Sequence, residues 1–163
     1  MATVQRPDKR PPVLTADEKA TLVHFLEYLR ESFSYKLAGL TDEEARRRLV
    51  PSGTSLIGLA KHLAGVELGW FCSTFAGQEV NADRNLKPDE TLASVLDQYK
   101  TACARADEVI AACSDMSQPC ARIRPDGQQP TFRWVLTHIV EETARHAGHA
   151  DILREQIDGQ VGR

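Results

Sequence analysis

The sequence predicts an all-α protein built as a four-helix bundle, with a long crossover connection between its second and third long helices. Apolar residues recur at helical spacing in four long segments, and no segment alternates as a strand does. A polar, turn-rich stretch at residues 77–88 is long enough to cross a bundle end. Uniform composition over 163 residues predicts one domain at residues 15–163, after a charged, proline-rich extended arm at residues 1–14.

The first long helix is expected from residue 15 to about residue 39. Thr15-Ala16-Asp17-Glu18 has the form of a capping box, in which a hydroxyl and a carboxylate satisfy the free amides at a helix start. Thr41-Asp42-Glu43-Glu44 repeats the signal and opens a short helix, which ends before Pro51 and Gly53. The first long helix, this short helix and the second long helix make up the first half of the predicted bundle.

The second long helix is capped by Thr54 or Ser55 and continues to about Phe75, with Trp70 in its apolar stripe. The third is expected at residues 91–113 and the last at residues 132–157, with a proline-rich loop between them. Asp158-Gly159 ends the last helix, because glycine readily adopts the left-handed conformation found there.

Composition argues against several classes of function, although segregated charge would still allow nucleic-acid binding. The net charge of −3 supplies no basic surface for nucleic acid. No apolar run is long enough for a membrane span, and the first residues lack the pattern of a secretory signal. Four cysteines without a C-x-x-C pair are typical of reduced, mostly buried thiols. The sequence therefore predicts a cytoplasmic protein that binds neither nucleic acid nor membrane.

The last helix carries the most informative residues. Its His146 falls near the centre of the apolar stripe, and Glu142 lies one turn earlier, about 40° away. A histidine and a carboxylate directed into a core need partners there, and a bound metal ion would supply them. The alternative is a hydrogen-bonded network of Glu142, His146 and Arg145 without metal.

The other histidines differ in their expected roles. His62 lies on the flank of the second helix, where one more imidazole would complete a three-ligand site. His149 follows His146 by three residues, so it can bind the same metal or orient a bound water. His138 is expected at the edge of the stripe, as a boundary residue or a partner of a ligand, and His24 on the surface.

These motifs resemble a known family. The segments SLIGLAKHLAGVE at residues 55–67 and EETARHAGHADILR at residues 141–154 are similar to the DinB-like (DinB/YfiT) superfamily, and more narrowly to its actinobacterial "mini-circle" branch. The resemblance implies a four-helix bundle, often a homodimer, with a divalent metal held by three histidines. His62 and His146 match two of them, and Glu142 stands where the third is expected. Either this carboxylate binds the metal or His149 takes the vacant role.

The resemblance also implies an activity, because relatives include thiol S-transferases that use small thiols such as mycothiol or bacillithiol, and some hydrolases and isomerases. We therefore expect a metal-dependent transferase that adds a low-molecular-weight thiol to an electrophile. Zinc or nickel is the first expectation for the metal, and manganese or iron the alternative. His149 would be a ligand or a proton carrier, and Arg145 or Arg154 would bind an anionic group or form salt bridges.

A second hypothesis comes from a different class of protein. The departure from three histidines favours a non-catalytic, dimeric metal-binding or stress-response bundle. Tyr28, Tyr35 and Trp134 are aromatic residues that an interface between two copies of this chain could use.

Overall fold

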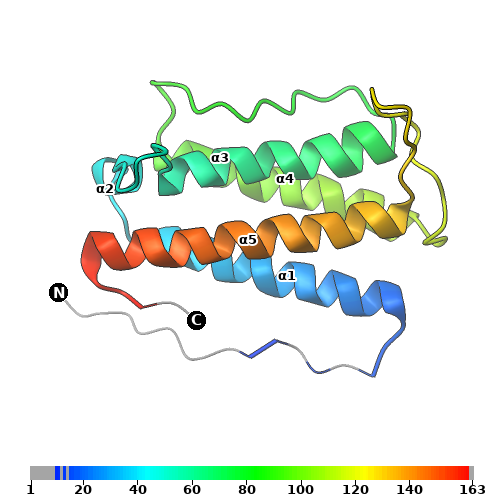
Figure 1. Cartoon of the computed structure of the whole chain (residues 1–163), viewed down its shortest axis with the longest axis horizontal. Helices are drawn as coiled ribbons and strands as arrows, with labels where there is room; N and C mark the ends of the chain where they lie inside the picture. The colour runs from blue at the N-terminus through cyan, green and yellow to red at the C-terminus, as the bar shows by residue number, and fades with distance from the viewer. Residues whose placement is uncertain (1–9, 12, 14, 162–163) are drawn as a thin grey trace.

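Figure 1 shows the protein as a computed structural model, which describes residues 10, 11, 13 and 15–161. The described part of the chain contains helices and no strand, so the all-α prediction is confirmed. Most of the arm predicted at residues 1–14 lies outside the described residues. The elements are α1 (Glu18–Leu37), α2 (Asp42–Arg46), α3 (Leu56–Glu67), the π-helical segment η1 (Leu68–Phe75), α4 (Leu92–Ala112) and α5 (Phe132–Asp158).

The helices begin where side chains satisfy their free amides. Thr41 and Glu44 form the predicted capping box of α2, and Ser55 caps α3. The cap predicted at Thr15 is wrong by two residues: the Asp17 carboxylate accepts a hydrogen bond from the amide of Ala20 at 2.7 Å, and α1 begins at Glu18. Aspartate is a strong N-cap residue, so it takes the position that the first threonine was expected to hold.

The long helical segments lie lengthwise beside one another. Within the described residues α1 packs mainly along α5, and α3 packs mainly along α4. In Figure 1, residues 76–91 run back along the outside of α3, so α3 and α4 point in the same direction. This segment is the long crossover connection that the sequence predicts. None of the helices in the described part of the chain combines the length and hydrophobicity that crossing a bilayer requires.

The second long helix has the predicted extent, but its last part is a π-helix. The amide of Ala76 donates to the carbonyl of Phe71, five residues back. Phe71 and Phe75 are buried, and their ring centroids lie 6.4 and 4.9 Å from that of Phe132. Trp70, predicted in the apolar stripe, is only half-buried, because the widened turn directs the two phenylalanines into the core instead.

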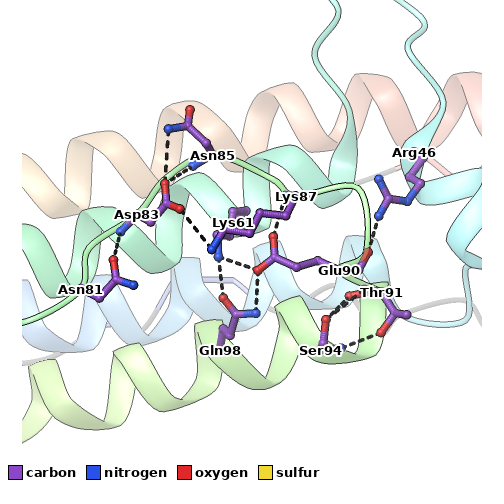
Figure 2. Close-up of polar contacts among 10 residues, drawn as sticks. All are labelled: Arg46, Lys61, Asn81, Asp83, Asn85, Lys87, Glu90, Thr91, Ser94 and Gln98. Atoms are coloured by element: carbon purple, nitrogen blue, oxygen red, sulfur yellow. Dashed lines mark hydrogen bonds and ion pairs between the residues drawn. The ribbon is translucent and has the colours of Figure 1, made fainter.

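A polar network fastens the crossover to α3 and α4 (Figure 2). Lys61 of α3 is 5% exposed, and its Nζ donates to Oε1 of Glu90 at 2.6 Å and to Oε1 of Gln98 at 2.7 Å. Gln98 of α4 in turn donates to Glu90 at 2.9 Å. Partial burial acts to raise the pKa of Glu90, but the hydrogen bonds from Lys61, from the backbone amide of Lys87 and from Gln98 prevail and lower it to about 2. The buried lysine is therefore paired on both sides.

The crossover also approaches α3 at Gly65 and the start of η1 at Gly69. A Cβ at Gly65 would lie 2.5 Å from Cγ of Arg84 and 2.9 Å from the carbonyl oxygen of Ala82. A Cβ at Gly69 would lie 3.1 Å from Nη2 of Arg84. Only glycine at position 65 leaves room for the loop backbone at this distance, whereas at Gly69 the end of the Arg84 side chain could move aside.

We expect Gly65→Ala to destabilise the protein by about 1–3 kcal/mol, because the added methyl collides with loop backbone. Gly148→Ala is the matched control: Gly148 is an exposed residue of α5 whose Cβ would meet nothing within 4 Å. Its replacement should leave stability unchanged or raise it by up to about 1 kcal/mol. Urea unfolding followed by circular dichroism measures both, and equal effects would contradict the close approach.

Candidate metal centre

Three side chains predicted as ligands converge between α3 and α5. Oε2 of Glu142 lies 3.1 Å from Nε2 of His146 and 3.7 Å from Nε2 of His62. The two imidazole centroids are 4.8 Å apart. One donor atom from each of these three residues lies within 4.8 Å of the others, the spacing that a shared ion requires. The structure thus brings His62, Glu142 and His146 together, as the sequence predicts.

The position of this cluster differs from the expected one in a single respect. His146 was expected at the centre of the buried stripe, but its side chain is 16% exposed, and Thr143, Ala147 and Ala150 occupy the buried face of α5 there. Glu142 and His146, four residues apart, therefore line the seam toward α3. The side chains of His62, Glu142 and His146 are 33%, 21% and 16% exposed, so the cluster is only partly screened from solvent.

Burial controls the charge of both imidazoles. Desolvation lowers the pKa of His62 below its usual value, and the positive charge of Arg84 adds to this, while Glu142 acts in the opposite direction. Desolvation likewise lowers the pKa of His146, with His62 and His149 adding to it against Glu142. The neutral imidazole that results is the form that binds a metal ion.

The chemistry of the cluster fits a cation better than a closed hydrogen-bonded network. Nδ1 of His146 is buried and has no hydrogen-bond partner among the described residues. Arg145, which the metal-free alternative needs beside Glu142, is exposed and pairs with Glu141. A self-sufficient polar network would satisfy its buried atoms, whereas this one leaves donor capacity unused.

His149 and His138 flank the cluster. His149 is exposed, with its ring centroid 5.5 Å from that of His146, and it does not belong to the group of converging donor atoms. His138 lies on the other side of Glu142, with Nε2 at 3.9 Å from Oε1. It stacks on Trp134 at 4.8 Å and meets Trp70 edge-on at 4.9 Å. Trp134 therefore packs within this chain, beside the site.

Other predicted residues lie away from the cluster. Arg154 is buried and donates to Asp158 and to the carbonyl groups of Lys36 and Ala38, so it ties helix ends together. His24 is exposed on α1, as predicted. All four cysteines are unpaired. Burial raises the pKa of Cys103 to about 12, so this thiol stays protonated and is a poor nucleophile.

The sequence did not predict that Arg84 lies near this site. Arg84 belongs to the crossover, where nothing in the sequence indicates that its charge acts on His62. The only signal was the pair of glycines at positions 65 and 69, spaced to lie on one face of a helix.

The fold and the site define a DinB-like helical-bundle protein. The structure is similar to a DinB-like protein from Bacillus cereus, with a TM-score of 0.66 and 19% identity over 84% of this chain and 91% of that one. It is also similar to a conserved protein from Enterococcus faecalis, with a TM-score of 0.63 and 16% identity over 90% of this chain and 100% of that one. The chain belongs to the mycothiol S-transferase family, whose model matches residues 21–159. Comparison with curated proteins finds no match.

We expect the purified protein to bind about one divalent ion per chain, and His62→Ala, His146→Ala and Glu142→Ala each to weaken this binding more than roughly 100-fold. His149→Ala should weaken it less than about tenfold, because that side chain lies outside the converging group. Elemental analysis and a chelator competition measure these affinities. His24→Ala, on a remote exposed surface, is the control, and a normal affinity in His146→Ala would exclude this centre.

The lowered pKa values of His62 and His146 predict a pH dependence of the metal-free protein. The unfolded chain takes up protons at higher pH than the folded one, so stability is fully present above the unfolded pKa and declines as pH falls through the folded values. Urea unfolding between about pH 7.5 and 5 should show this decline. A double variant, His62→Gln with His146→Gln, should flatten it, and an unchanged slope would contradict the assignment.

Proposed function

We propose that this protein is a metal-dependent transferase that joins a low-molecular-weight thiol, of the mycothiol kind, to an electrophile. The observation that carries the proposal is the convergence of His62, Glu142 and His146 in a chain of the mycothiol S-transferase family. Two imidazoles and one carboxylate are a donor set of reactive zinc sites, in which three protein ligands leave a position open to substrate.

A bound divalent cation would act as a Lewis acid and keep a thiol deprotonated and nucleophilic near neutral pH. Zinc or nickel suits this donor set first, and manganese or iron second. His62 and His146 would hold the ion through a ring nitrogen each, and Glu142 through a carboxylate oxygen. Because burial keeps both imidazoles neutral, they remain available for binding at physiological pH.

His149 is the proton carrier in this proposal. It is exposed beside His146, so it can exchange protons with solvent while it borders the cluster. In the transfer, a sulfur–carbon bond forms as the electrophile's leaving bond breaks. The proton of the thiol passes to the imidazole of His149 and from there to solvent, while a halide leaving group departs as the free anion. No electrons are gained or lost overall, so no further reactant is needed.

We also propose, as the sequence predicts, that the protein is a cytoplasmic homodimer and that it binds neither nucleic acid nor membrane. The net charge of −3 supports the absence of nucleic acid. Of the aromatic residues named for a dimer interface, Tyr28 and Tyr35 are half-buried on α1, while Trp134 is 42% exposed.

A turnover assay tests the transferase. Zinc- or nickel-loaded protein should conjugate mycothiol to a chromogenic aryl halide, and activity should disappear with a chelator and in His146→Ala. His149→Gln should retain the metal yet lower kcat by about 100-fold, as loss of a general base does. His24→Gln is the control. Stoichiometric metal without turnover across a panel of thiols and electrophiles would favour the alternative, a non-catalytic metal-binding bundle.

A further inference from the structure

Arg84 is held against α3 on the helix face that carries His62. Its stem crosses Gly65, where a Cβ would lie 2.5 Å from Cγ, and its guanidinium reaches Gly69, where a Cβ would lie 3.1 Å from Nη2. His62 and Gly65 of α3 and Gly69 of η1 are separated by three and four residues, so they follow one another along one face where η1 continues α3. The side chain therefore lies along this face toward η1.

The loop around Arg84 is tied by local hydrogen bonds (Figure 2). Oδ1 of Asp83 accepts from the backbone amide of Asn85 at 3.0 Å and from its side chain at 3.3 Å. The backbone amide of Asp83 donates to Asn81 at 3.2 Å. The neighbouring carboxylate of Asp83 is thus engaged with Asn85, and it lies 3.8 Å from Nζ of Lys87. These hydrogen bonds hold the backbone on both sides of Arg84 and so fix where its side chain leaves the loop.

The guanidinium of Arg84 is unused within the described part of the chain. It makes no hydrogen bond or ion pair there, and the residue is exposed. Several other exposed or half-exposed arginines differ: Arg122 pairs with Glu79, Arg133 with Glu18, and Arg145 with Glu141. Among these four arginines, only Arg84 packs closely against a helix near the candidate metal centre and also has a guanidinium group whose donors are unpaired among the described residues.

We propose that Arg84 binds an anionic group, a carboxylate or a group of similar charge, on a ligand that reaches the metal centre. The planar guanidinium matches the two oxygens of such a group. Gly69 lies seven residues beyond His62, about 10 Å along the helix axis. The ligand's charge should therefore lie about 10 Å from its reacting atom. This inference rests on the proposed function and adds a specificity-determining residue to it.

The anion could belong to the thiol or to the electrophile, and two arms separate these sources. In the first, calorimetry measures the Kd of ω-mercapto-carboxylic acids and their amides for zinc-loaded protein. The acid with eight carbons should bind about five- to tenfold more tightly than its amide, whereas 3-mercaptopropionate, too short to reach Arg84, should show no such preference. In the second arm, KM is compared for 4-chloro-3-nitrobenzoate and its methyl ester.

Arg84→Gln should abolish the carboxylate preference in whichever arm shows it and leave affinity for the neutral ligand unchanged. Arg84→Lys should retain part of the preference that Arg84→Gln loses, because lysine keeps the positive charge but lacks the paired N–H donors of the guanidinium. Lys87→Gln is the matched control, an exposed cation of the same loop that should have no effect.

A carboxylate preference that is absent from both arms, or that survives in Arg84→Gln, would overturn the assignment of Arg84 alone. If the protein binds no zinc, the proposed function fails as well, so the two failures are distinguishable.

Discussion

The carboxylate of Glu142 is the group on which the site depends. Its oxygens face His146 at 3.1 Å, His62 at 3.7 Å and His138 at 3.9 Å. Burial favours the neutral form of His62 and His146, so these imidazoles bring no positive charge to the carboxylate. Among the described residues no lysine or arginine pairs with Glu142. A cation shared by all three ligands would neutralise it and use the lone pairs of the imidazoles at the same time.

A carboxylate in place of a third imidazole changes the electrostatics of such a centre. The anionic ligand lowers the net positive charge of the site by one, which weakens its pull on a thiol proton. Arg84, whose charge already acts on the imidazole of His62, offsets part of this loss. In the proposed centre, the carboxylate of Glu142 and the charge of Arg84 would therefore act in opposite directions on the electrostatic potential at the metal.

How much of this could be predicted from the sequence depends on the range of the interactions involved. Helix starts at Thr41 and Thr91 follow from side chains three residues from the amides they bind, so local patterns predict them. The spacing of Glu142 and His146 is equally local. The π-helical turn was not predictable, because it depends on how Phe71 and Phe75 pack on Phe132, far along the chain. The place of Arg84 depends on a loop that folds back over Gly65, and no periodic pattern encodes that.

The network that fastens the crossover also orients the site. Lys61 precedes His62 on α3, so the two side chains leave the helix about 100° apart. Hydrogen bonds from Lys61 to Glu90 and Gln98 fix one side of α3 toward α4 and the crossover. His62 is thereby directed toward α5. Because the pKa of Glu90 is about 2, its carboxylate stays ionised through the range in which histidines titrate. Mild acid should therefore act on the imidazoles of the cluster while the crossover that positions them stays in place.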